Sequence, residues 1–169
     1  KVTREEIMQK MFLKTATYTF IRPLLMGASL TKDIKNEEKN FEELGSNLGL
    51  AFQIQDDLLD IKFDTNKTKK STFSDIEHHQ HTLFTNYIFE NGTKEEKKKL
   101  ESKFGNKLSE EDKIILRDML IKSGAIEHGE KEIVKYLNNA KVIIEKIDIE
   151  FQYKKGFLEM ISKLLGRSN

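Results

Sequence analysis

Three aspartates near the middle of the chain have the residue type and the spacing needed to bind a divalent cation. Asp56, Asp57 and Asp60 lie at positions i, i+1 and i+4, so on a helix Asp56 and Asp60 project from one face with Asp57 beside them. Their charges repel each other, and a cation would relieve that repulsion. Because magnesium prefers hard oxygen ligands and is usually held by one or two carboxylates together with substrate phosphates, the cluster predicts a magnesium–diphosphate site.

An exposed polar face at a helix end is the alternative interpretation, since carboxylates are ordinary there. The residues that precede the cluster bear on this choice. Helical steps backward from the aspartates reach Gln53, Gly49 and Gly45, a stripe without a bulky apolar side chain. We therefore expect another group to approach this stripe closely.

The first third of the sequence predicts two helices that would carry these residues. Thr3 and Glu6 have the spacing of a capping box, so a first helix should begin just after Thr3. Pro23 predicts a bend or break within the stretch from Phe20 to Leu30, because it lacks a backbone N–H and its ring crowds the preceding turn. Apolar residues at spacings of three and four predict a second helix from about Glu37 to Asp60.

In the rest of the chain, capping residues and glycines also predict where helices begin and end. Residues 62–73 have no apolar period and predict a loop. Ser74 with Glu77 has capping-box spacing. A helix is predicted from Ser74 to Gly92, and a second one begins at Thr93, which has capping-box spacing with Glu96. Further helices are predicted from Ser109 to Gly124, from Ala125 to about Ile147, and over a C-terminal segment that ends at Gly166.

Composition limits the class of protein. The 169 residues are 37% hydrophobic, enough for one core, and one proline with 34% charged residues favours helices over strands. Lys+Arg number 29 and Asp+Glu 28, so no net field draws the chain to nucleic acid. Apolar runs are too short for a membrane span, and the lack of cysteine is compatible with a cytoplasmic location. We predict one all-α domain over residues 1–169.

The motif as a whole resembles one enzyme family. Phe52-Gln53 followed by Asp56-Asp57-Leu58-Leu59-Asp60 resembles the second aspartate-rich motif of the trans-type isoprenyl diphosphate synthases, which include the farnesyl and geranylgeranyl diphosphate synthases. Further matches follow in order along the chain: Phe12-Leu13-Lys14-Thr15-Ala16, Met26-Gly27-Ala28, Lys70, Ser74-Asp75-Ile76, and Lys122-Ser123-Gly124-Ala125-Ile126. The resemblance covers roughly residues 3 to 145.

The resemblance implies a fold, a reaction and a cofactor. The fold would be the C-terminal half of the isoprenoid synthase helical bundle. The reaction would be the condensation of isopentenyl diphosphate with an allylic diphosphate to a longer trans-prenyl diphosphate, with Mg²⁺ as cofactor. Product chain length is not readable, because in this family it depends largely on residues near the first aspartate-rich motif.

The resemblance also implies roles for individual residues. Asp56 and Asp57, with Asp60 as the next candidate behind them, would hold Mg²⁺ against the allylic diphosphate. Phe52 and Gln53 would line the reacting centre. The diphosphate-binding residues would be Lys14, Thr15, Lys70 and, at a position where the family has a lysine, Gln80; the catalytic candidates are Lys14, Gln53 and Lys70.

Lys14 also has an argument of its own. It is placed on the helical stripe of Ile7 and Met11, where a buried ammonium is costly unless an anion meets it. A diphosphate would supply the anion that pairs with the Lys14 ammonium, and the Thr15 hydroxyl would add a neutral hydrogen bond to the same diphosphate. The alternative is a lysine that extends outward along its apolar stem.

Gln80 departs from the family pattern because an amide can donate a hydrogen bond but brings no positive charge. Protonated His78, His79 and His81 could compensate for the missing lysine. The three histidines could also suggest zinc, but adjacent side chains on a helix diverge, so a surface cluster is favoured.

The first aspartate-rich motif of the family is absent from this sequence. Either the chain is part of a longer enzyme or another polypeptide supplies the N-terminal half, and a start at Lys1 without Met favours the first. A homodimer is expected on the family pattern. Two other functions remain open: a non-catalytic or regulatory partner subunit of a heteromeric prenyl synthase, and a helical interaction module whose acidic motif binds nothing.

Overall fold

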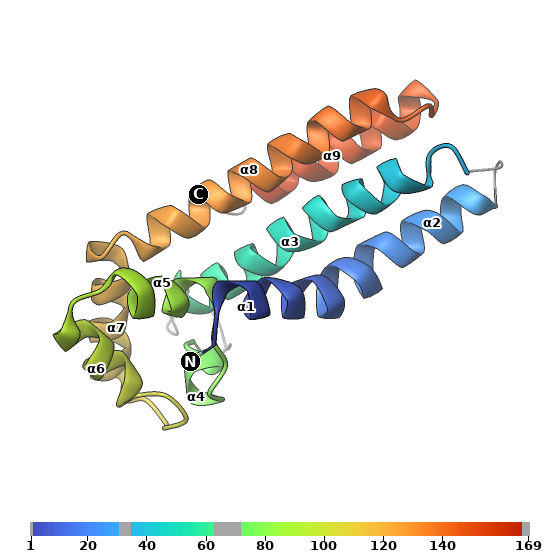
Figure 1. Cartoon of the computed structure of the whole chain (residues 1–169). Coiled ribbons are helices and arrows are strands. Elements are labelled where there is room, and N and C mark those ends of the chain that lie inside the picture. The colour runs from blue at the N-terminus through green and yellow to red at the C-terminus, as the bar shows by residue number, and fades with distance from the viewer. Residues whose placement is uncertain (1, 31–34, 63–71, 167–169) are drawn as a thin grey trace. The chain divides into compact units, whose positions relative to one another are not determined.

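The computed structural model describes residues 2–30, 35–62 and 72–166, and these residues form helices without a strand. The elements, labelled in Figure 1, are α1 (Arg4–Met11), the π-helix η1 (Phe12–Ile21), α2 (Arg22–Ser29), α3 (Glu38–Lys62), α4 (Ser74–Glu77), α5 (Leu83–Asn91), α6 (Lys94–Glu101), α7 (Glu110–Lys122), α8 (Ala125–Lys146) and α9 (Phe151–Gly166). The predicted all-α class is confirmed. No helix in the described part is long and apolar enough to cross a membrane.

The chain divides into two compact units, each with its own packing. Residues 8–53 and 132–169 form what we call the long-helix unit, and residues 1–7 and 54–131 form the short-helix unit. The division falls inside α3 and inside α8. Because of this, α3 contributes Phe52 and Gln53 to the long-helix unit and the three aspartates to the short-helix unit.

The N-terminal helix begins where the capping box predicts. The Thr3 backbone N–H donates to Glu6 Oε2 at 2.8 Å, and the Glu6 N–H donates to Thr3 Oγ1 at 3.2 Å. The reciprocal pair satisfies two donors that a helix start leaves without partners.

Pro23 does not break the helical path, which continues through α1, η1 and α2. Proline lies in the first turn of α2, and the preceding ten residues form a π-helix. There the Arg22 N–H donates to Thr17 O, five residues back. The predicted break does not occur between Phe20 and Leu30, and the irregular stretch of this helical path is the π-helix, most of which precedes it.

Two glycines of α3 allow η1 to approach at backbone distance within the long-helix unit. A Cβ atom added to Gly49 would lie 2.4 Å from Ala16 Cα, and one added to Gly45 would lie 2.9 Å from Ile21 Cα. The close approach expected along the stripe of small residues is confirmed. The approaching group is a neighbouring helix.

The helices α8 and α9 complete the long-helix unit and run antiparallel, in orange and red in Figure 1. Close to the turn between them, Lys154 Nζ donates to Glu145 O at 2.9 Å. Fully or almost fully buried apolar residues of this unit include Leu44, Leu48, Leu137, Ala140, Ile144, Ile147 and Ile161. Their helical spacing explains why the amphipathic pattern located both helices correctly.

The single helix predicted from Ser74 to Gly92 is wrong, because the chain forms two helices there. The short helix α4 ends at Glu77, His79 adopts a left-handed backbone with φ 57°, and α5 starts after Thr82. Thr82 and Thr85 form the capping box, with N–H to Oγ1 distances of 2.9 and 3.3 Å.

The residues of the expected capping box at Ser74 are used in long-range contacts. Ser74 Oγ donates to Asp60 Oδ1, and the Glu77 carboxylate accepts from the Leu108 N–H at 2.9 Å. Neither contact is visible in local spacing. The capping boxes predicted at Thr93 and Ser109, in contrast, form as expected.

We expect Gly49→Ala to destabilise the protein although alanine favours a helix. The new Cβ would overlap the Ala16 backbone, and overpacking costs about 1–3 kcal/mol, more than the gain of up to about 1 kcal/mol in helix propensity. Urea unfolding should show a lower free energy of unfolding.

Gly156→Ala on α9 is the matched control, since a Cβ there meets nothing within 4 Å. This variant should gain up to about 1 kcal/mol. If the two variants changed the free energy of unfolding equally, the close approach of η1 to α3 would be wrong.

Candidate functional site

The C-terminal half of α3 carries the candidate residues over about two and a half turns. Asp56 is exposed, Asp57 is 6% exposed, and Asp60 is half-buried. The alternative of an exposed polar helix face fits Asp56 but does not fit Asp57. A buried carboxylate needs hydrogen bonds or a cation to offset its lost hydration.

Thr15 and Gln53 form a direct pair in the long-helix unit. Thr15 Oγ1 donates to Gln53 Oε1 at 2.5 Å, and Thr15 is 6% exposed. The close approach of Ala16 to Gly49 brings the side chains of Thr15 and Gln53 within hydrogen-bond distance of each other. The ring of Phe52, which precedes Gln53 on α3, packs on the ring of Phe20 from η1 with centroids 5.7 Å apart. The sequence motifs name Thr15 and Gln53 separately, and the structure links them.

Lys14 is exposed, so its predicted burial is wrong. Steps of four from Ile7 through Met11, both buried, reach Thr15 rather than Lys14. In the π-helix that follows, backbone bonds span five residues, so a step of three leaves the buried face. The ammonium therefore keeps its hydration and stays open to an anion from solvent.

Asp60 is bonded by Phe73, Ser74 and Asp75, which lie further along the chain. Its Oδ1 accepts from Ser74 Oγ at 2.9 Å, its Oδ2 accepts from the Asp75 N–H at 3.3 Å, and its backbone O accepts from the Phe73 N–H at 3.0 Å. A carboxylate has about four lone-pair sites. The side chain therefore keeps acceptor capacity while its orientation is fixed.

The histidines do not form a metal site. In the described part of the chain, no three or more His, Cys, Asp or Glu side chains are grouped to hold a metal ion. The rings of His79 and His81 instead pack on Phe104, with centroids 5.4 and 4.7 Å apart. This agrees with the surface interpretation and gives no support to zinc.

The aspartates suit magnesium better than a metal held by protein alone. Magnesium keeps several waters and commonly takes one or two carboxylates plus phosphate oxygens. Asp56 and Asp57 offer hard oxygen donors of this kind, although the described residues do not bring the three predicted aspartates together as a three-residue metal group. The donor set therefore fits Mg²⁺ with a phosphorylated ligand.

Two expected diphosphate contacts are less defined. Gln80 is half-buried in the turn that follows α4, where its N–H donates to Asp75 O at 2.7 Å. Lys70 lies outside the described residues. Their roles stay predictions.

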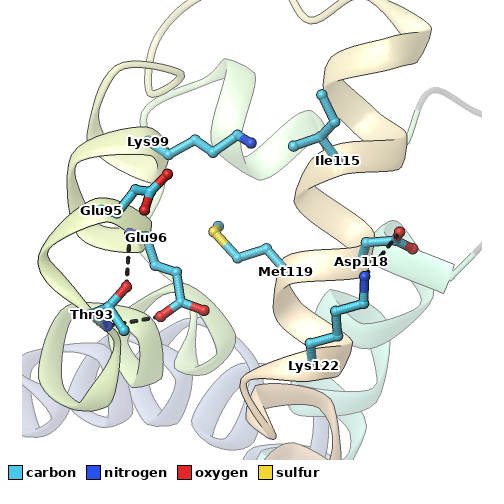
Figure 2. Close-up of a pocket in the computed structure, with 8 residues that line it drawn as sticks. All are labelled: Thr93, Glu95, Glu96, Lys99, Ile115, Asp118, Met119 and Lys122. Carbon is cyan, nitrogen blue, oxygen red and sulfur yellow. Dashed lines mark hydrogen bonds and ion pairs between the residues drawn. The ribbon is translucent and has the colours of Figure 1, made fainter.

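Figure 2 shows a pocket of about 460 Å³ between α6 and α7, away from the aspartate motif in sequence. Its polar side chains are largely engaged with one another. Glu96 Oε2 accepts from the Thr93 N–H at 2.7 Å, and Lys122 lies 3.7 Å from Asp118. A second pocket, of about 310 Å³, lies in the long-helix unit and is lined mainly by apolar residues of α2 and α9. Neither contains a residue of the predicted site.

The comparisons with known proteins agree on one group of enzymes. A family model described as polyprenyl synthetase matches residues 1–122. The chain is 30% identical over 162 residues to a geranylgeranyl diphosphate synthase of Saccharolobus solfataricus, covering 96% of this chain and 48% of that protein. It is 28% identical over 124 residues to a geranylfarnesyl diphosphate synthase of Aeropyrum pernix, covering 73% and 38%. The chain thus spans about half the length of these curated relatives.

Solved structures share the fold. A geranylgeranyl pyrophosphate synthetase from Pyrococcus horikoshii matches with a TM-score of 0.85 at 27% identity, over 98% of this chain and 50% of that one. A geranylgeranyl pyrophosphate synthase from Corynebacterium glutamicum, solved with isoprenyl diphosphate and magnesium, matches with a TM-score of 0.88 at 24% identity, over 96% and 46%. The helices are those of about half an isoprenoid synthase fold.

We expect Ser74→Ala to lower the free energy of unfolding by about 1.5 kcal/mol, the low end for a hydrogen bond to a charged group, since this one is only partly buried. Ser162→Ala, on an exposed face of α9, should change it by less than about 0.5 kcal/mol. Chemical denaturation of both variants compares the two losses. Equal small effects would contradict the bond between Ser74 and Asp60.

Proposed function

Because this chain belongs to the polyprenyl synthetase family, we propose that it supplies the second aspartate-rich half of a prenyltransferase site. The reaction would condense isopentenyl diphosphate with an allylic diphosphate to a longer trans-prenyl diphosphate. One observation supports this most: on α3, a buried and an exposed aspartate follow the Gln53 side chain, itself bonded to Thr15, within about one turn.

The rest of the fold would come from the half that the relatives have beyond this chain, since the chain spans about half their length. That half would lie on the same polypeptide, in an enzyme that forms a homodimer, or on a second polypeptide that complements this chain. We call this chain together with that half the assembled protein. The substrates and the complete activity belong to the assembled protein.

Asp56 and Asp57 would hold Mg²⁺, with Asp60 behind them fixed by Ser74 and Asp75. When bound, Mg²⁺ supplies positive charge to the diphosphate leaving group. Lys14, exposed on η1, would donate hydrogen bonds to the same diphosphate. Negative charge develops on the leaving group as the bond breaks, so these cationic partners bind the transition state more tightly than the ground state.

The bond changes balance without a further reactant. The allylic C–O bond breaks and its electron pair leaves with the diphosphate. The double bond of isopentenyl diphosphate would attack the allylic cation, and the released diphosphate would take the proton whose loss restores a double bond. The Thr15 hydroxyl would hold the Gln53 amide in one orientation beside this centre, and the Phe52 ring would help to exclude water from the cation.

Gln80 favours a second candidate, a non-catalytic partner subunit. The resemblance puts a lysine at this position, and an amide leaves more of the leaving-group charge uncompensated. The two candidates agree on ligand binding but differ in turnover. Prenyl product formed by the assembled protein supports the enzyme, whereas binding of diphosphate without product supports the partner subunit.

We expect Mg²⁺ with inorganic diphosphate to raise the thermal midpoint of the assembled protein. Ligand that binds only the native state stabilises it, by about 2.7 kcal/mol at one hundred times the dissociation constant. The double variant Asp56→Ala, Asp57→Ala should lose the increase in thermal midpoint.

The control is the double variant Glu95→Ala, Glu111→Ala, which removes two exposed acids from α6 and α7 of the same unit. It should keep the full increase. An undiminished increase in the aspartate variant would remove these carboxylates from the metal site.

A further inference from the structure

The C-terminal end of α3 is capped by a side chain from another helix. The last four carbonyls of an α-helix have no partner within it. In α3, Asp60 O accepts from the Phe73 N–H at 3.0 Å, and Ile61 O accepts from Arg117 Nε of α7 at 2.8 Å. Arg117 also places a positive charge at the helix end, where the helix dipole favours it.

The same arginine contacts the returning chain segment. Its guanidinium lies over the Phe73 ring, 5.4 Å from the centroid. Phe73 is 1% exposed and adopts a left-handed backbone, with φ 61°. A left-handed conformation is unusual for a bulky residue and persists only where its surroundings hold it. Arg117 is thus in contact with both chain segments that meet at Asp60.

These contacts link Arg117 to the aspartate motif through Ile61 and Phe73. Phe73 leads directly into Ser74 and Asp75, whose hydroxyl and N–H fix the two oxygens of Asp60. If the return segment or the last turn of α3 moved, Asp60 would lose its donors. Groups that orient metal ligands commonly affect metal affinity as strongly as some ligands do.

We propose that Arg117 is a positioning residue for the metal–diphosphate site, acting through Ile61 and Phe73 on Asp60 and on the end of α3. This inference rests on the proposed function, because it assigns Asp60 to that site. It adds Arg117, a residue of α7 that belongs to none of the motifs of the family resemblance, to the groups that determine metal affinity.

The test compares Arg117→Met with Ser109→Ala in the assembled protein. Methionine keeps an unbranched apolar side chain but removes the donor and the charge. Ser109→Ala removes the N-terminal cap of the same helix and should cost about 1 kcal/mol without touching α3. A merely structural role for Arg117 would make the two variants alike.

Two readouts separate positioning from stability. Hydrogen exchange of the Phe73 and Asp75 amides, whose protons bond to Asp60, should be faster in Arg117→Met and unchanged in Ser109→Ala. The Mg²⁺ midpoint, measured by thermal shift at saturating inorganic diphosphate, should rise about tenfold in Arg117→Met only. Groups that orient metal ligands typically change metal affinity by about 10- to 100-fold. We expect the low end of this range, because Arg117 acts through a second residue.

Arg117→Lys tests the physical cause. A lysine retains the charge and a donor for a single carbonyl and can lie over an aromatic ring. It should recover more than half of the tenfold change on a logarithmic scale, and a lysine variant as impaired as Arg117→Met would contradict the inference.

The inference and the proposed function fail in different ways. If the unsubstituted protein showed no response to Mg²⁺ and diphosphate, the proposed function would be wrong. If the unsubstituted protein responded and Arg117→Met had the same Mg²⁺ midpoint and the same amide exchange, Arg117 would not be a positioning residue.

Discussion

Three carboxylates lie close together near the C-terminal end of α3, and the groups around this end have to offset their negative charge. Asp56, Asp57 and Asp60 repel one another, and negative charge near a helix C-terminus is also opposed by the helix dipole. The fold offsets part of this cost with donors from Ser74 and the Asp75 backbone, which bond to Asp60. If the proposed cation binds Asp56 and Asp57, it would add to the stabilisation of α3.

The other half of α3 meets a different constraint, which is distance. Gly45 and Gly49 have no side chain, so the backbone of η1 can pack directly against α3. This close packing allows the Thr15 hydroxyl to donate a hydrogen bond to Gln53 Oε1. One helix thus supplies a closely packed segment that fixes neutral hydrogen bonds and an end segment that carries charge. A substitution that widened the first segment would displace Thr15 without altering any aspartate.

Features that depend on local spacing could be predicted from the sequence, and features that depend on distant partners could not. The capping residues Thr3, Thr93 and Ser109 and the course of α3 follow from periodicity and cap chemistry. The family and half of its fold follow from motif order, and the comparisons confirm both. Sequence reasoning identified the aspartates, Thr15 and Gln53 but did not link Thr15 to Gln53.

The errors have physical causes of the same kind. Ser74 has the spacing of a cap, but its hydroxyl bonds to Asp60, fourteen residues earlier. The left-handed backbone of His79 follows α4, and α5 begins with its own cap at Thr82. Lys14 is predicted to share the buried stripe of Ile7 and Met11. Buried residues recur there in steps of four, so the stripe continues at Thr15 instead. The contact of Arg117 with Ile61 O cannot be predicted from local spacing, because it joins helices 56 residues apart in the chain.

We propose that the α3 aspartates bind a divalent cation together with a diphosphate. Electron paramagnetic resonance of Mn²⁺, used in place of Mg²⁺, measures this most directly in the assembled protein. The signal of free Mn²⁺ should fall on addition of protein and inorganic diphosphate beyond the fall that diphosphate causes alone, and Asp57→Asn should abolish that difference. A difference of equal size in Asp57→Asn and in the unsubstituted protein would contradict the claim.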